Sequence, residues 1–505
     1  MALKNSFVRF DLETHATDFV PDALAADTLR SLIHQQDVQL NGFDDEITQL
    51  RVRIRALEEQ KAEVAKFRDL HRAFLAPIRK LPPEILGEVF VQCLLALRDE
   101  ERSRFKKFAD VFNVCGPLFR VCKRWKRIAL GTPGLWTVFQ VIPGTKDRVQ
   151  MCLDKSGALP IQILLDPDIR NGFLEVQPIL DNFHRVEEID GFDVHLMEEI
   201  LRRECIFPTP VLRVVRLTDA GRFSQDQCFR FQNIIQAPAI ESLELTNCIC
   251  LLSVFCRNLG KLHHLKLAED SESQLDLYIP ALLDILQFSS SLRSLHLRLP
   301  RQMMAIRADI SMITVPHLRL LDVRGRRNHI LELLAVLDAP YLDRLTLAYW
   351  GERNSTSSWI PIQTFLRANP PPLRSLTLSR VSLGTGNDFG DFISRLSHLE
   401  YLELDKCDVD VGHLMALILD SCLQHDNMVC PKLATLSLIQ KTFAGEVLVE
   451  LVKSRAPLPG VPWENRCLQS VKIQCGFFED TCISGLEVIS ATCGSRLTID
   501  WLEWL

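Results

Sequence analysis

The chain has 505 residues, of which 47% are hydrophobic and 24% are charged, as in ordinary globular proteins. This length predicts two or more structural units rather than one core. A formal net charge of −6 at pH 7 excludes the strong basic excess of a protein that binds nucleic acid through its overall charge.

Neither a signal peptide nor a membrane span is visible in the sequence. The first 16 residues lack an apolar core, and the longest apolar run, residues 248–256, is far shorter than the roughly 20 residues that cross a bilayer. The 16 cysteines are scattered and contain no C-x-x-C pair, so we expect reduced, buried thiols and no metal site. Cys248 and Cys250 are expected to point the same way on a strand and to pack. The sequence therefore predicts a protein of the cytoplasm, the nucleus or both.

Residues 1–27 show no periodicity and predict a loose lead. Residues 28–76 carry a heptad pattern that predicts a coiled-coil helix, interrupted by Gly42 and by the polar seam positions Gln36 and Lys61. Such a seam requires a partner, which is either a second copy, giving a homodimer, or another part of the same chain. The apolar seam positions are Leu29, Ile33, Leu40, Phe43, Ile47, Leu50, Ile54, Leu57 and Val64.

A different helical pattern follows. The double proline at 82–83 ends the preceding helix and favours a new one, whose apolar stripe covers residues 85–97. The charged residues 98–107 predict a solvated connection. A second helix with one apolar face is predicted over 118–130, and an apolar segment resumes at 135–136.

Three segments in this region occur in a characteristic order: L-P-P-E-I-L at 81–86, V-C-K-R-W-K-R-I-A at 121–129 and T-P-G-L-W at 132–136. Together they resemble the F-box domain, in particular the F-box-like proteins that are abundant in mushroom-forming fungi. The resemblance covers residues 77–140 and implies a small three-helix unit that docks on a Skp-family adaptor, which connects to a cullin scaffold. By this resemblance, the adaptor-binding residues are Leu81, Pro82, Pro83, Glu84, Ile85, Leu86, Val89, Phe90, Val121, Cys122, Trp125, Leu135 and Trp136.

The template L-x-x-L-x-L recurs through the rest of the chain at intervals of roughly 22 to 35 residues, typical of leucine-rich repeats. Two copies place a cysteine, Cys248 or Cys407, at the Asn/Cys position of the fuller repeat signature. The first apolar position of each copy is Leu212, Ile240, Leu262, Leu292, Leu318, Leu342, Leu373, Leu399, Leu433 or Leu468.

Helical stripes at 195–204, 278–289 and 329–338 separate these predicted strands, and residues 159–166 and 185–192 predict the first, atypical turns. Strands alternating with helices at this period predict a leucine-rich-repeat solenoid, a horseshoe, over 155–505. The fold class expected for the whole chain is therefore α/β, with an N-terminal coiled-coil helix, a three-helix F-box and a C-terminal solenoid.

Residues that alternate with the leucines are expected on the open, concave face of such a solenoid. They run from a basic middle, residues 264–344, to an acidic patch at 403–405, which suits recognition of a protein target. The alternative is that they form only a soluble surface. The candidate target-binding residues are Glu244, His264, Lys266, His296, Arg298, Asp322, Arg324, Arg344, Tyr401, Glu403 and Asp405.

No nucleophile elbow, P-loop, zinc-protease or dinucleotide-binding motif occurs, so we expect neither catalysis nor a cofactor. The sequence predicts a substrate-recognition adaptor subunit of an SCF-type (Skp–cullin–F-box) ubiquitin ligase. The alternative is a leucine-rich-repeat interaction scaffold with no role in ubiquitin transfer. The basic residues within 102–127 raise a third possibility, nucleic-acid binding, but no stacking aromatic platform accompanies them and we expect no such partner.

Overall fold

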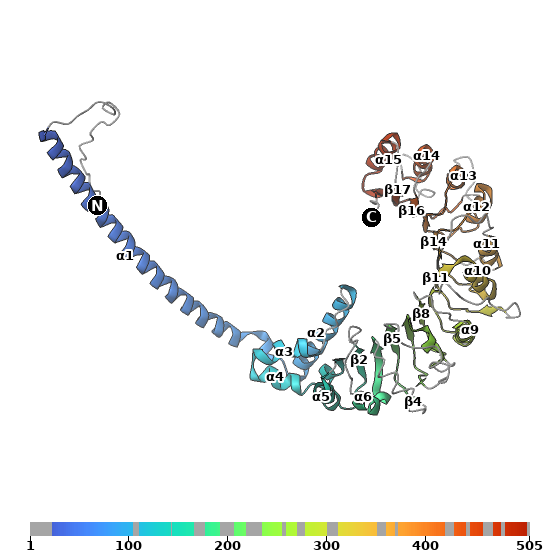
Figure 1. The fold of residues 1–505 in the computed structure, drawn as a ribbon, viewed down its shortest axis with the longest axis horizontal. Helices are drawn as coiled ribbons and strands as arrows, with labels where there is room; N and C mark the ends of the chain where they lie inside the picture. Colours follow the sequence, from blue (N-terminus) through green and yellow to red (C-terminus); the bar gives the residue numbers. More distant parts are fainter. Residues whose placement is uncertain are drawn as a thin grey trace. The chain divides into compact units, whose positions relative to one another are not determined.

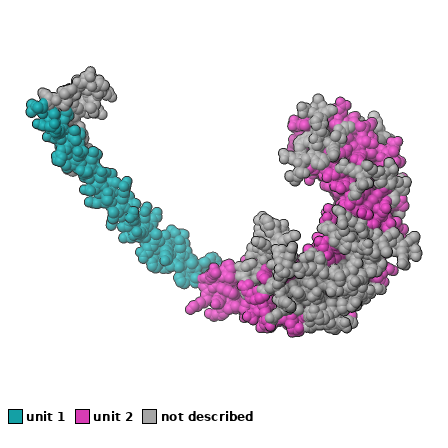
Figure 2. Space-filling view, in the orientation of Figure 1, with its two compact units in different colours: residues 1–86 teal, residues 87–505 magenta. Residues whose placement is uncertain are grey.

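The computed structural model describes residues 23–104, 111–142, 144–165, 177–191, 207–218, 235–254, 259–269, 278–299, 312–350, 360–368, 372–419, 429–440, 445–457, 468–475 and 480–501. The protein is mixed α/β, with a long N-terminal helix and a large parallel sheet (Figure 1). The chain forms two compact units, residues 1–86 and 87–505 (Figure 2).

Helix α1 (Ala23–Leu75) is 53 residues long and runs without a break through Gly42. It begins before the predicted residue 28, so residues 23–27 are helical rather than part of a loose lead; residues 1–22 lie outside the described residues. The helix ends where Pro77 follows, because proline disfavours a helical conformation in the residue before it, and Ala76 is accordingly extended at ψ 131°. The prediction of a long helix is confirmed.

The motif-bearing region is helical but is divided differently from the prediction. A short 3₁₀ helix, η1 (Pro77–Lys80), precedes α2 (Pro83–Arg104), so the charged residues 98–104 continue a helix rather than forming a connection; residues 105–110 lie outside the described residues. The single helix predicted over 118–130 is two helices, α3 (Val111–Val121) and α4 (Lys123–Leu130).

The break between α3 and α4 has a local cause. Cys122 is extended, with φ −165° and ψ 166°, and its Sγ accepts a hydrogen bond from the backbone N–H of Trp125 at 3.5 Å. This is the geometry of a helix N-cap, in which a side chain satisfies one of the first N–H groups of the helix. The apolar periodicity continues across the break and therefore did not reveal it.

The threonine-proline-glycine segment after α4 leads into the 3₁₀ helix η2 (Pro133–Trp136), of which Leu135 and Trp136 are buried. The indole Nε1–H of Trp136 donates to the carbonyl oxygen of Ala129 at 3.1 Å. Helix α2 lies against the start of this turn so closely that a Cβ atom added at Gly87 would sit 2.7 Å from the Thr132 hydroxyl. Glycine at 87 thus sets the approach of α2 to the turn.

Among the described residues, the parallel sheet has 14 strands, and their order across the sheet follows their order in the chain. Two short strand pairs, β4 (Phe207–Pro208) with β6 (Ile235–Gln236) and β10 (Ile313–Thr314) with β12 (Leu337–Asp338), lie outside this sheet. The strands of the large sheet are β1 (Val138–Val141), β2 (Ile161–Leu165), β3 (Val186–Asp190), β5 (Val214–Thr218), β7 (Ser242–Thr246), β8 (His264–Ala268), β9 (Ser294–Arg298), β11 (Leu320–Arg326), β13 (Arg344–Trp350), β14 (Ser375–Ser379), β15 (Tyr401–Asp405), β16 (Thr435–Gln440), β17 (Ser470–Cys475) and β18 (Thr498–Trp501).

The repeat template predicted the strands correctly. From β5 to β17, each strand of the large sheet begins two residues after a predicted first apolar position, as β5 does after Leu212 and β17 after Leu468. Every one of those first positions is at most 1% exposed. The two upstream segments predicted as atypical turns contain β2 and β3. The leucines thus bury one face of the sheet, and the residues that alternate with them form the opposite, open face.

Helices follow many of the strands and pack next to one another, as α10 packs with α11 and α14 with α15 (Figure 1). The helices predicted over 278–289 and 329–338 are confirmed as α9 and α10, and residues 195–204 lie outside the described residues. The strand predicted around Cys250 is wrong, because residues 249–254 form the 3₁₀ helix η4. The described helices that follow β1 are α5 (Lys146–Ser156), α6 (Gln177–Asp181), α9 (Tyr278–Phe288), α10 (Arg327–Val336), α11 (Ile360–Ala368), α12 (Gly386–Ile393), α13 (Val411–Met415), α14 (Gly445–Arg455) and α15 (Asp480–Cys493), with the 3₁₀ helices η3 (Phe183–Arg185), η4 (Ile249–Val254) and η7 (Gly494–Arg496).

A turn recurs at the strand ends. The residues that follow β7, β14 and β15 are Asn247, Arg380 and Lys406, and their φ angles are 56°, 56° and 55°. Each donates its backbone N–H to a carbonyl oxygen on the following strand, at 2.7, 2.7 and 2.6 Å respectively. These three repeats are therefore equivalent in backbone conformation as well as in their leucines.

On the leucine side of the sheet, buried polar side chains donate hydrogen bonds to backbone carbonyls. The thiols of Cys248 and Cys407, the predicted Asn/Cys positions, donate to the carbonyl oxygens of Leu217 and Leu378 at 3.4 and 3.0 Å. Burial raises the pKa of Cys407 to about 12, so this thiol stays protonated and able to donate. Further along, the Arg455 guanidinium is 2% exposed and donates to three backbone carbonyls, those of residues 417, 429 and 430, at 2.6, 2.6 and 2.9 Å.

Candidate partner-binding surfaces

A row of polar residues, one from each strand from β3 to β18, crosses the sheet on the open face, although its member Ser437 is itself buried. Parallel pairing without a shift from β5 onward sets these side chains side by side across the sheet. In sheet order, this row is Asp190, Arg216, Glu244, Lys266, His296, Asp322, Thr346, Thr377, Glu403, Ser437, Lys472 and Asp500.

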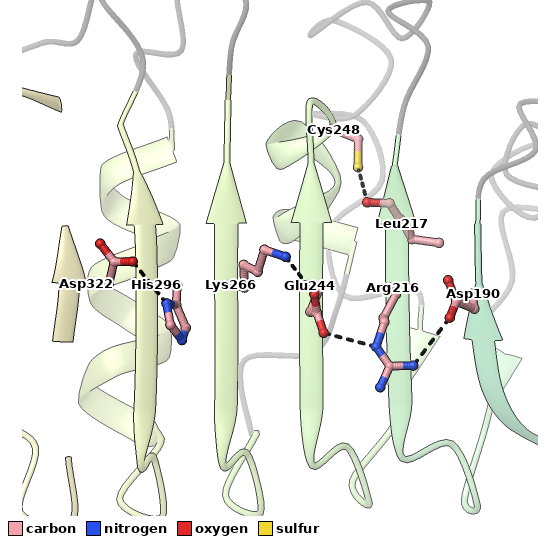
Figure 3. Close-up of polar contacts among 8 residues, drawn as sticks. All are labelled: Asp190, Arg216, Leu217, Glu244, Cys248, Lys266, His296 and Asp322. Atoms are coloured by element: carbon pink, nitrogen blue, oxygen red, sulfur yellow. Dashed lines mark hydrogen bonds and ion pairs between the residues drawn. The ribbon is translucent and has the colours of Figure 1, made fainter. Parts of the chain in front are cut away.

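The first six members of this row, Asp190 to Asp322, are ionisable and form a charge ladder (Figure 3). Arg216 is the second member of the ladder, and its guanidinium is 3.5 Å from the Asp190 carboxylate and 3.0 Å from the Glu244 carboxylate. The Lys266 ammonium reaches the other oxygen of Glu244 at 3.1 Å. Arg216 also contacts Glu188 at 2.5 Å, two residues before Asp190 on β3. One guanidinium on β5 therefore joins three carboxylates, two on β3 and one on β7.

The ladder continues across β9 and β11 with a second cluster. His296 Nδ1 is 3.4 Å from the Asp322 carboxylate, which also accepts a hydrogen bond from Arg324 Nε at 3.0 Å. Arg298, at the end of β9, packs its guanidinium 5.3 Å from the centre of the Trp350 ring. This distance is within the range of a cation–π contact.

The pKa values of the ladder residues reflect these pairs. Burial alone would lower the pKa of Arg216, but the carboxylates around it together raise that pKa. Burial alone would raise the pKa of Glu244, and Lys266 and Arg216 lower it overall. The pKa of Asp322 is likewise lowered, because hydrogen bonds from His296 and Arg324 outweigh its burial. Both carboxylates are thus held in the charged form.

The structure places all the predicted target-binding residues on the open face, but it changes the interpretation of their charge. The basic middle predicted over 264–344 is largely compensated, because Lys266 pairs with Glu244, and His296 and Arg324 pair with Asp322. His264 has a lowered pKa, first because it is partly buried and then because cationic groups surround it. Arg344 is more exposed, with two thirds of its side chain accessible.

The predicted acidic patch is also linked to its neighbours. Tyr401 donates its hydroxyl proton to Glu403 on the same strand, and Ser379 on β14 donates to the Asp405 carboxylate at 2.6 Å. Burial, followed by the Glu403 carboxylate, raises the pKa of Tyr401. Arg216 and Asp190 were absent from the sequence prediction. The alternation that follows Leu212 would have identified Arg216.

The structure divides the predicted adaptor-binding residues by exposure. Ile85, Val89 and Val121 are apolar yet 52%, 38% and 57% exposed. Leu81, Cys122 and Trp125 are partly buried, and the rings of Trp125 and Phe90 lie 5.0 Å apart. Pro82, Pro83 and Glu84 are also exposed, whereas the fully or almost fully buried members are Leu86, Phe90, Leu135 and Trp136.

No protein-family model matches this chain, and neither does any curated protein. Its function is therefore inferred from its own residues.

The described part of the chain carries signs of neither a membrane span nor a metal site. None of its helices combines the length and apolar character that crossing a bilayer requires. Its histidine, cysteine and carboxylate side chains do not gather in threes as metal ligands would. The candidate surfaces are thus the open face of the sheet and the exposed motif residues.

Proposed function

We propose that the protein is the substrate-recognition adaptor subunit of an SCF-type ubiquitin ligase. In this proposal, residues 77–140 are an F-box that docks on a Skp-family adaptor joined to a cullin scaffold. Residues 155–505 are a leucine-rich-repeat solenoid whose open, concave face holds a target protein. The subunit performs no chemistry itself; it raises the effective concentration of the target near a ubiquitin-charged enzyme.

The observation that carries the docking proposal is the division of the motif residues by burial. Leu135 and Trp136 are fully buried, so the last motif serves the packing of this region. Ile85 and Val121, from the first and second motifs, instead expose more than half of their surfaces. Apolar side chains that a small helical region leaves exposed, beside a proline-rich turn, are typical of residues that a partner covers.

The repeat region supports the solenoid part of the proposal. Its strands pair in chain order, and the first apolar position of every repeat is buried. The left-handed backbone conformation that follows β7 also follows β14 and β15. A repeat that contacts only its neighbours is the defining feature of solenoid proteins. Its open face presents side chains from many parallel strands, which suits binding of an extended protein surface.

The test is capture of partners by the full-length chain from a lysate that contains Skp-family adaptor and cullin. Wild type is expected to capture both, and Leu81→Ala combined with Pro82→Ala is expected to lose both. The matched control combines Val488→Ala with Met415→Ala, two apolar residues that are 65% and 59% exposed on α15 and α13. The control should bind like wild type.

Failure of wild type to capture the adaptor would overturn the proposal. The protein would then be better described as a repeat scaffold with no role in ubiquitin transfer. Equal capture by wild type and by the Leu81–Pro82 variant would instead show that the adaptor binds elsewhere than the motif.

A further inference from the structure

Helix α1 exposes its whole apolar seam. Ile33, Phe43, Ile47, Ile54 and Val64 are 54%, 60%, 44%, 54% and 67% exposed. No described residue of the first unit therefore covers this seam. An apolar stripe sustained over about five heptads is the surface of a coiled coil.

The residue types along the seam indicate the kind of coiled coil. With Leu29 at position d, the next seam residue, Ile33, falls at position a, and the alternation continues to Val64. Isoleucine then occupies a at residues 33, 47 and 54, and leucine occupies d at residues 29, 50 and 57. Isoleucine at a with leucine at d favours two parallel strands, because the two positions pack with different geometry in a parallel dimer.

The charges beside the seam match a second copy of the same helix. In a parallel, in-register pair, each g residue faces the e residue of the next heptad on the partner helix. Glu46 at g then faces Arg51 at e, and Arg53 at g faces Glu58 at e. Both pairs join opposite charges, and two-fold symmetry repeats each of them.

An antiparallel pair overlapping along the whole seam is less favourable. There e faces e and g faces g, so Asp44 meets Arg51 and Glu46 meets Arg53 as opposite charges. The same register also sets Glu58 against Asp37, a pair of like charges that occurs twice and that the parallel pair lacks. This alternative would bring the two polar seam residues, Gln36 and Lys61, opposite one another, whereas the parallel pair matches each of them with itself. The two orientations therefore differ in which residue faces Gln36.

We propose that α1 binds a second copy of this chain as a parallel, in-register, two-stranded coiled coil over residues 29–64. The occupant is a second copy because the charge pairs are self-complementary between two copies of α1, and the isoleucines at a with leucines at d favour two parallel strands. The dimer presents two copies of the open sheet face to a target, so a repetitive target is bound with avidity. The dimer proposal does not depend on the ubiquitin-ligase proposal.

The first test measures the molar mass of the purified full-length chain by light scattering after size exclusion. Wild type is expected at twice the chain mass of 57.6 kDa. Ile47→Glu combined with Ile54→Glu should halve this mass by placing charges in the seam. The matched control is Val38→Glu combined with Val52→Glu, which adds the same charges to the same helix at exposed positions outside the seam and should remain dimeric.

The second test determines the orientation by mild oxidation of Gln36→Cys followed by non-reducing electrophoresis. Residues 23–75 contain no cysteine, so wild type provides the background. The parallel dimer crosslinks Gln36→Cys to itself. Crosslinking that requires a mixture of Gln36→Cys with Lys61→Cys would overturn the parallel arrangement. A monomeric wild type, or a control pair that dissociates as the seam pair does, would overturn the dimer itself.

Discussion

Replacing Arg216 with methionine should destabilise the sheet around β5. The guanidinium contacts Glu188 at 2.5 Å and Glu244 at 3.0 Å, and Glu188 is only 5% exposed. Breaking a buried ion pair by removing one partner costs about 3–5 kcal/mol, because the remaining charge stays buried. The Arg216 side chain is 30% exposed, and water screens this pair in part. We therefore expect a loss of about 2–3 kcal/mol.

The measurement is hydrogen exchange of the full-length chain, followed by mass spectrometry of peptides from β3 to β7. A local readout is needed because a long array of repeats need not unfold in one step. Adding Glu188→Gln to Arg216→Met should recover at least half of the loss, since a neutral amide no longer requires a cation.

The matched control for this prediction is Arg344→Met. Arg344 is two thirds exposed and lies 3.8 Å from Asp343, so its loss should cost at most about 0.5 kcal/mol. If Arg216→Met cost as little as this control, or if Glu188→Gln failed to restore protection, the ladder would contribute nothing to stability and the reasoning would be wrong.

Two further predictions concern other buried or paired charges. Arg455→Met should destabilise the structure around α14 by about 3–5 kcal/mol, because three backbone carbonyls, two of them buried, lose their donor, and Arg455→Lys should recover only part of this loss. Hydrogen exchange of peptides from α14 measures both changes, and equal protection in Arg455→Met and wild type would show that the bonds contribute nothing. The pKa values of Glu244 and Asp322 are lower in the folded protein than their usual values of 4.5 and 3.8, so their charged forms stabilise the fold. This stabilisation is complete above the usual pKa values and is lost as the pH falls through the pKa values of the folded state. Unfolding measured between pH 6 and pH 3 should depend on pH less steeply in Glu244→Gln than in wild type, and identical slopes would contradict the assignment.

The strands were predictable because their signal is local. A residue such as Leu212 or Leu399 begins a pattern of period two, and the same short template locates the buried face, the open face and the start of the strand. Helix α1 was predictable for the same reason, since its heptads repeat within a few turns. The side of the sheet on which Lys266 or Glu403 lies also followed from alternation alone.

The partners of those side chains could not be predicted in the same way. Arg216 and Glu244 are separated by 28 residues along the chain, and only the register of β5 with β7 brings them together. The ladder is therefore a property of strand pairing rather than of any single repeat. The interruption at Cys122 was missed for the opposite reason, because it depends on one backbone conformation within an unbroken apolar pattern.

The strand order has a consequence for synthesis. Each described strand of the large sheet pairs with the strands of that sheet that come before and after it in the chain, even where β4, β6, β10 or β12 intervenes. As the polypeptide leaves the ribosome, the strand with which each new strand pairs has therefore already been synthesised and lies at the edge of the sheet. The sheet can assemble from its N-terminal end at the pace of translation, and a chain interrupted late in synthesis would keep the strands already laid down.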